Sequence, residues 1–221
     1  MTSSWLSVSS VAKKVYMAIA GLFLITFLLV HLGINLCLLR DDSGEWFTAA
    51  ATFMSTNYIV KVFEVFLFLG FILHIILGII LQIENWMARP QRYKVEGYSH
   101  TSFFSKYMIH TGVIVFIFLC IHMTNFYFVK LGFVSVPEGA ADKHDFYTMA
   151  GMLFANKTYS VFYIFFMIIL GFHLNHAFQS AFQSLGLNHS RYMPAIKLMG
   201  TVYSIIVPLG FAVIPVFYLM N

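Results

Sequence analysis

Five runs of mostly apolar residues, each long enough to cross a lipid bilayer, constrain this chain more than any other feature of its sequence. A membrane-spanning helix needs about 20 such residues in succession, because the hydrocarbon core is roughly 30 Å thick and a helix rises about 1.5 Å per residue. The sequence therefore predicts an all-α membrane protein with five transmembrane helices. They are expected at about residues 15–39, 58–83, 107–129, 159–182 and 196–219.

The composition agrees with lipid as the main solvent of this chain. Of its 221 residues, 60% are apolar and only 10% are charged, whereas a soluble domain carries about 25% charged residues. We find no repeat at solenoid spacing, so residues 1–221 are expected to form one membrane domain. The two cysteines, Cys37 and Cys120, have no CxxC or CxxCH spacing, which argues against zinc, iron–sulfur clusters and covalently bound haem c.

The distribution of Lys and Arg predicts the orientation. With the N-terminus inside the cell, the inner segments hold eight of the 13 basic residues and the outer segments hold five. Short loops rich in Lys and Arg stay on the inner side. We therefore expect the N-terminus inside and the C-terminus outside, and the basic net charge needs no nucleic-acid partner to explain it.

Histidines are concentrated in the first four predicted helices. Ionisable residues within membrane spans are rare and usually functional. The fifth predicted helix has none, which suggests a four-helix functional core with one peripheral helix. The six histidines within the spans are His31, His74, His110, His122, His173 and His176.

Counting from the polar ends of the helices places four of these histidines in two layers. His31 lies nine residues before Arg40 and His122 eight before Lys130, so both are expected toward the outer face. His74 lies ten residues before Glu84, toward the inner face. His173, ten residues before Gln183, is expected at the same depth as His74.

Two neutral imidazoles facing each other across a helix bundle are the ligands of a b-type haem. The depths therefore predict two haem b groups, one between His31 and His122 and one between His74 and a histidine of the fourth helix. His176 follows His173 by three residues and could replace it. The alternative is that the histidines form interhelical hydrogen bonds. His110, closer to the inner surface, could contact a haem propionate or simply lie at the membrane interface.

Glycines and one acid add to this pattern. Gly70 and Gly78 flank His74 at a spacing of four, where small residues would admit either a flat macrocycle or a neighbouring helix. Gly21 and Gly112 each precede an outer histidine by ten residues, which places them near the inner layer. Glu64, the only acid well inside a predicted span, is a candidate for proton transfer linked to a quinone; a buried structural hydrogen bond and an outward tilt of the side chain to water are the alternatives.

Four stretches carry a resemblance to a known family: GLFLITFLLVHLGIN around His31, EVFLFLGFILHIILGI around His74, FIFLCIHMTNF around His122 and GFHLNHAFQSAFQSLG around His173. Over nearly its full length, the chain resembles the dihaem cytochrome b membrane anchor of succinate:quinone oxidoreductases, the five-helix type also found in fumarate reductases. In that family the ligand of the fourth helix stands thirteen residues before a glycine. Gly186 stands thirteen residues after His173, so the resemblance selects His173 over His176.

The resemblance implies the membrane subunit of a bacterial enzyme complex in the cytoplasmic membrane. The chain would bind two haems b and pass electrons between a quinone, expected to be menaquinone, and an iron–sulfur subunit on the inner side. That subunit would be joined to an FAD-containing flavoprotein, which performs the dicarboxylate chemistry. The inner segment 89–106 is the expected docking loop. Some fumarate reductases carry a glutamate two residues before the fourth-helix histidine; here it is Gly171, so that proton pathway is not expected.

Two other classes of membrane protein also place histidines in their spans. One is the haem b subunit of a hydrogenase, formate dehydrogenase or nitrate reductase, whose ligands are less evenly spaced. The other is a transporter with histidine proton relays. Transporters commonly break their helices with Gly and Pro, whereas the only prolines in the predicted spans are Pro208 and Pro215, both in the fifth.

Overall fold

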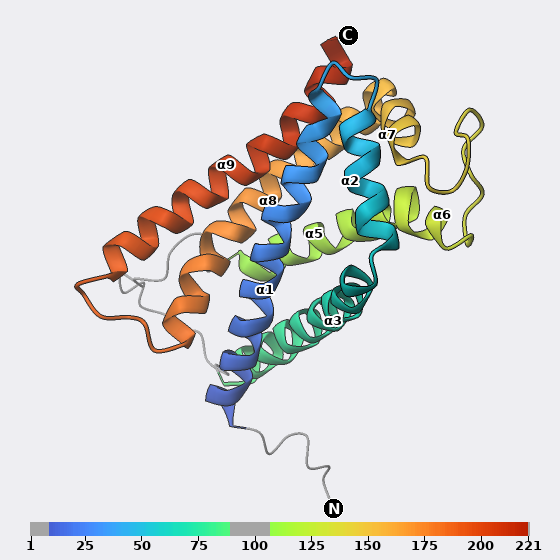
Figure 1. The fold of residues 1–221 in the computed structure, drawn as a ribbon. Coiled ribbons are helices and arrows are strands. Elements are labelled where there is room, and N and C mark those ends of the chain that lie inside the picture. Colours follow the sequence, from blue (N-terminus) through green and yellow to red (C-terminus); the bar gives the residue numbers. More distant parts are fainter. Residues whose placement is uncertain (1–8, 89–106, 221) are drawn as a thin grey trace, which may run out of the picture.

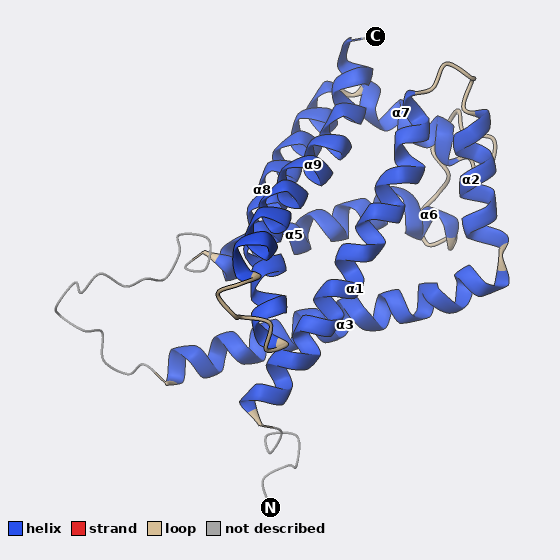
Figure 2. Cartoon of the chain, turned by 60° about the vertical axis from the view of Figure 1, so that its left-hand side comes forward, coloured by secondary structure: helices blue, strands red, loops and turns tan. Residues whose placement is uncertain are grey.

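The computed structural model of the chain describes residues 9–88 and 107–220. Within this part the chain is a bundle of long helices without strands, and five helices are long and apolar enough to cross a membrane (Figures 1 and 2). They are α1 (Ser10–Leu36, continued by the 3-10 turn Cys37–Leu39), α3 (Tyr58–Met87), α5 (Met108–His122, continued by a π-helical turn, Met123–Tyr127, and by α6, Phe128–Lys130), α8 (Lys157–Ser184) and α9 (Met193–Met220). The prediction of an all-α membrane protein is confirmed.

The helices extend a few residues beyond most of the predicted apolar runs. The runs measure the hydrocarbon-crossing part, whereas the helix itself continues until a side chain caps its free N–H groups. Ser9 accepts from the N–H of Ala12 at the start of α1. Asn57 and Asn156 do the same at the starts of α3 and α8. At about 1.5 Å per residue, α3 and α8 reach more than 40 Å, enough to span the headgroup regions as well.

Two shorter helices close one end of the bundle. The helices α2 (Glu45–Thr56) and α7 (Phe146–Ala155) lie in the connections after α1 and before α8, at the end where the C-terminus also lies (Figure 1). A buried cluster joins them to α8 and α9. We call this the outer end, after the orientation expected from the charges, and the opposite end the inner end. The start of α1 and the end of α9 lie at opposite ends of the bundle (Figure 1).

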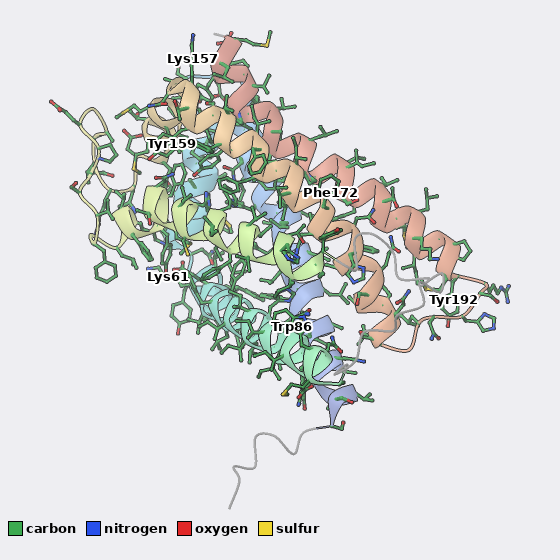
Figure 3. All side chains as sticks on the ribbon, turned by 180° about the vertical axis from the view of Figure 1, so that it is seen from behind. Lys61, Trp86, Lys157, Tyr159, Phe172 and Tyr192 are labelled. Atoms are coloured by element: carbon green, nitrogen blue, oxygen red, sulfur yellow. The ribbon has the colours of Figure 1, made fainter. Side chains whose placement is uncertain are left out.

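The packing of the long helices is uneven. The helices α8 and α9 pack along much of their length, and α1 packs against α3, α8 and α9. The α5 helix packs against α8, whereas α3 and α5 have few direct contacts. Helix α9 therefore lies against both α1 and α8, whereas α3 and α5 approach each other less closely in the described part of the chain. Figure 3 views the bundle from behind, with Lys61 and Trp86 marking the two ends of α3 and Phe172 the middle of α8.

Candidate functional site: two histidine pairs inside the bundle

The outer pair consists of His31, near the end of α1, and His122, the last residue of the regular part of α5. Their ring centroids are 5.8 Å apart and the rings are nearly perpendicular, at 78°. The two residues are half-buried. The structure thus brings together the two histidines whose depths in the sequence agreed.

The inner pair consists of His74, in the middle of α3, and His173, in the second half of α8. Their ring centroids are 6.3 Å apart, with an interplanar angle of 75°. The two pairs use one histidine from each of the four core helices, and their geometry is almost the same.

Both distances suit a metal held between the two rings. A metal–imidazole nitrogen bond of about 2.0–2.1 Å, followed by about 1.1 Å from that nitrogen to the ring centre, allows the centres of two rings that ligate one metal to be at most about 6.3 Å apart. The inner pair, at 6.3 Å, has this separation, and the outer pair, at 5.8 Å, is closer by about 0.5 Å. The residues therefore fit two bis-histidine haem sites.

Hydrogen bonding between helices accounts for only part of the histidine contacts. The Nδ1 atoms of His74 and His122 are buried and have no hydrogen-bond partner, although the backbone of Met17 lies beside the His74 ring. The polar contacts of His31 are with Asn35 of its own helix. A buried polar atom without a partner is rare and calls for an explanation such as a bound group. The alternative of interhelical hydrogen bonds is therefore supported at His173, where Oγ1 of Thr111 on α5 lies 3.4 Å from Nδ1, but not at His31 or His122.

Small residues lie against the inner pair as expected from their depth. A Cβ atom on Gly21 would be 3.6 Å from Cε1 of His74, and one on Gly112 would be 3.5 Å from Cε1 of His173. The two glycines four residues before and after His74 contact another helix instead. A Cβ atom on Gly70 would meet Phe23 of α1, and one on Gly78 would meet Met17 of α1. Gly21 and Gly112 thus face the inner histidines, and the other two serve close packing of α3 on α1.

Aromatic rings surround the outer pair, and the sequence interpretation missed them. Phe27 stacks on His31 at 5.2 Å, and Phe118 stacks on His122 at 5.7 Å. Each phenylalanine precedes its histidine by four residues, so α1 and α5 share the spacing Gly-x5-Phe-x3-His. That shared spacing could have indicated from the sequence that a phenylalanine lies beside each outer histidine. Phe211 of α9 also lies 5.7 Å from His31, so the peripheral helix contributes to the outer pair.

Glu64 lies near the outer end of α3 and forms side-chain contacts with the π-helical turn and with α6, which follow α5. It accepts a hydrogen bond of 2.6 Å from the Tyr127 hydroxyl and pairs with Nζ of Lys130 at 3.1 Å. Directly after His122, residues Met123–Tyr127 form a π-helical turn. The hydrogen bonds of such a turn join residues five apart. Tyr127 therefore follows His122 by one wide turn of the helix. We call Glu64, Tyr127 and Lys130 the Glu64 cluster. In the described part of the chain, its side-chain contacts join α3 to the segment that follows α5.

The other candidate residues lie apart from the pairs. The ring facing His74 belongs to His173, and within the described residues His176 makes no ring contact with another histidine. His110 is exposed and its ring contacts Tyr107.

Glu84, near the end of α3, forms an ion pair with Lys13 of α1, whose side chain is only 8% exposed. The sequence analysis placed Glu84 just beyond the second predicted span, whereas α3 continues past it to Met87.

Comparison of the chain with protein-family models, with curated proteins and with solved structures finds no match. The two histidine pairs are the features of the molecule on which a function can be proposed.

Proposed function

We propose that this protein is a dihaem cytochrome b, with one haem between His31 and His122 and the other between His74 and His173. The observation that carries the proposal is the pairing of four histidines from four helices at two depths, with centroid separations near 6 Å. The haem irons would supply the one-electron chemistry. The imidazoles would hold them through neutral ring nitrogens, while the apolar walls exclude water.

The chain would act as the membrane anchor and electron-transfer subunit of a succinate:quinone oxidoreductase, as its sequence resemblance implies. Two haem sites at different depths allow electrons to cross the bilayer in two steps. An iron–sulfur subunit, joined to an FAD flavoprotein, would dock at the inner end. Arg191 and Lys197 flank the start of α9 there. The expected docking loop, residues 89–106, lies outside the described residues.

The quinone is proposed to react at the outer end, near the Glu64 cluster. Quinol oxidation releases protons, so its site needs a proton acceptor close to a haem and open to water. The carboxylate of Glu64 accepts hydrogen bonds from Tyr127 and Lys130. We propose that this carboxylate is also the proton acceptor. Its side chain is 26% exposed, and the π-turn connects its partner Tyr127 to His122. A structural role of this ion pair in joining α3 to the segment that follows α5 is the competing account.

Single substitutions of the four histidines test the proposal. Replacing His31 or His122 with Ala should remove one haem and leave the other, and replacing His74 or His173 should remove the second. His176→Ala is the matched control, because it alters a half-buried histidine one turn from His173 and should leave both haems in place. The haem-to-protein ratio of each purified variant measures the outcome. Four variants that all retain two haems would contradict the assignment.

A further inference from the structure

His173 differs from the other three paired histidines in having a hydroxyl beside its Nδ1. Oγ1 of Thr111, on α5, lies 3.4 Å from Nδ1 of His173 on α8. The same hydroxyl donates its hydrogen to the backbone carbonyl of Met108, at 3.0 Å. A threonine hydroxyl has one hydrogen to donate and two lone pairs. Because that hydrogen is directed to Met108, the oxygen faces His173 as an acceptor.

We propose that Thr111 is the positioning residue of the inner haem site, an inference that rests on the proposed function. By accepting the Nδ1–H of His173, Thr111 fixes the tautomer in which Nε2 carries the free lone pair. It also fixes the rotation of the ring. Ligating histidines in metalloproteins almost always donate their second ring nitrogen to such an acceptor, and the acceptor makes the imidazole a stronger donor to the metal.

On the opposite half of the inner pair, no side-chain hydroxyl of the described residues lies beside the ring, and the group next to His74 is the backbone of Met17. Gly21 lies against His74 as Gly112 lies against His173, so Ala20 occupies on α1 the place that Thr111 occupies on α5. Alanine has no hydroxyl, and Nδ1 of His74 is without a partner. In the outer pair, Asn35 approaches His31 through its amide nitrogen, which is a donor. Thr111 is thus the one acceptor that the described residues direct at a paired histidine through a side chain.

The test is the midpoint potential of each haem in the purified protein. Thr111→Val keeps the shape of the side chain but removes the acceptor. The weaker donation by His173 should favour the ferrous state, so the potential of one haem should rise while the other stays unchanged. Thr111→Ser restores the hydroxyl and should return the parental potential. Thr124→Val is the matched control, since Thr124 bonds a carbonyl of the same helix segment and lies on its exposed side.

Two results separate the possible failures. If the parental protein binds two haems and Thr111→Val leaves both potentials unchanged, or if the Val and Ser variants behave alike, the role of Thr111 is refuted while the dihaem function stands. If the parental protein binds no haem, the proposed function fails and this inference fails with it. Loss of the inner haem in Thr111→Val but not in Thr111→Ser would support the inference, because only the acceptor differs.

Discussion

The two histidine pairs have the same geometry but different neighbours. Stacked phenylalanines hold the rings of the outer pair from their own helices, through Phe27 and Phe118. The inner pair is approached by glycines, and one of its rings by a hydroxyl. The outer pair therefore lies mainly among aromatic rings, with the Asn35 amide beside His31, and the inner pair lies beside backbone and one hydroxyl. The hydrogen bonding and burial around the ligands are among the means by which proteins set haem potentials.

A proton role for Glu64 can be separated from its role in packing by Glu64→Gln. Glutamine keeps the size of the side chain and its acceptor oxygen for Tyr127 but cannot exchange a proton. A proton-transfer group in a catalytic step contributes about 10²–10⁴-fold, so we expect quinol-linked turnover of the complex to fall by roughly two orders of magnitude or more. Both haems should remain bound. Turnover is measured with a soluble quinol and compared at equal haem content.

Glu84→Gln is the matched control for this experiment. Glu84 is the second carboxylate of α3 that pairs with a lysine of a neighbouring helix, and it lies at the opposite end. Its substitution should leave quinol turnover unchanged. If Glu64→Gln retains the parental rate, the carboxylate serves the ion pair alone and the outer quinone site loses its main support.

Histidine depth could be read from the sequence because the helices run nearly the full width of the membrane in alternating directions. Counting residues from charged ends then places His31 with His122 and His74 with His173. The partners Thr111, Asn35 and Phe211 could not be predicted in this way, since they depend on how each helix is rotated about its axis. The Lys13–Glu84 and Lys130–Glu64 pairs were missed for the same reason: depth alone does not specify which side chains meet.

The short helices α2 and α7 show what apolar run length cannot predict. Each is too short to span a bilayer, and α2 mixes polar and apolar residues, so packing on neighbouring helices stabilises them. Helix α7 packs on α8 and α9, and α2 packs on α1, α3 and α7. The contact between α2 and α7 depends on Gly44, which begins α2 with φ of +81°. A Cβ atom there would lie 2.4 Å from the Tyr147 ring of α7. The π-turn after His122 likewise had no signal in the apolar pattern.

Gly44→Ala should therefore destabilise the outer end. Alanine in the left-handed conformation costs about 1–2 kcal/mol, and the overlap with Tyr147 adds roughly 1–3 kcal/mol. Gly132→Ala is the control, because Gly132 also has a positive φ of +80° but a Cβ atom added there would have nothing within 4 Å. Thermal unfolding in detergent should begin at a lower temperature in Gly44→Ala than in Gly132→Ala. Equal temperatures would mean that the contact with Tyr147 is readily relieved.

The N-terminal cap of α7 makes a pH-dependent contribution to stability. Backbone N–H groups of Ala141 and Thr148 donate to the carboxylate of Asp145 and hold its pKa below the ordinary 3.8. Because the pKa is lower in the folded protein, the stabilisation is present above about pH 4 and is lost as the pH falls through the folded-state pKa. Below pH 4 the parental protein should lose thermal stability faster than Asp145→Asn. Parallel curves for the two proteins would refute this.

At the scale of the whole molecule, the long helices pack unevenly. Helix α9 lies against both α1 and α8, and its Phe211 lies 5.7 Å from His31, whereas α3 and α5 are joined mainly by the Glu64 cluster. The number of spans was predictable, because hydrophobic length specifies it. The uneven packing was not predictable, because all five helices are apolar around most of their circumference and their sequences do not specify neighbours.

The orientation in the membrane is tested with a pair of introduced cysteines in a protein whose Cys37 and Cys120 have been replaced by Ala. Glu138→Cys lies in the connection before α7, at the end expected outside, and Ser190→Cys lies between α8 and α9, at the end expected inside; both positions are exposed. A membrane-impermeant thiol reagent should modify the first in intact cells and the second only after lysis. The reverse pattern would place the N-terminus outside.

The central claim is that four histidines from four helices hold two b-type haems. The most direct measurement is the haem-to-protein ratio of the purified chain, obtained from its reduced-minus-oxidised and pyridine haemochrome spectra. The account predicts a b-type spectrum with two haems per chain, falling to one in His31→Ala and also in His74→Ala. A purified, folded protein without haem absorbance, produced in cells that make haem, would contradict it.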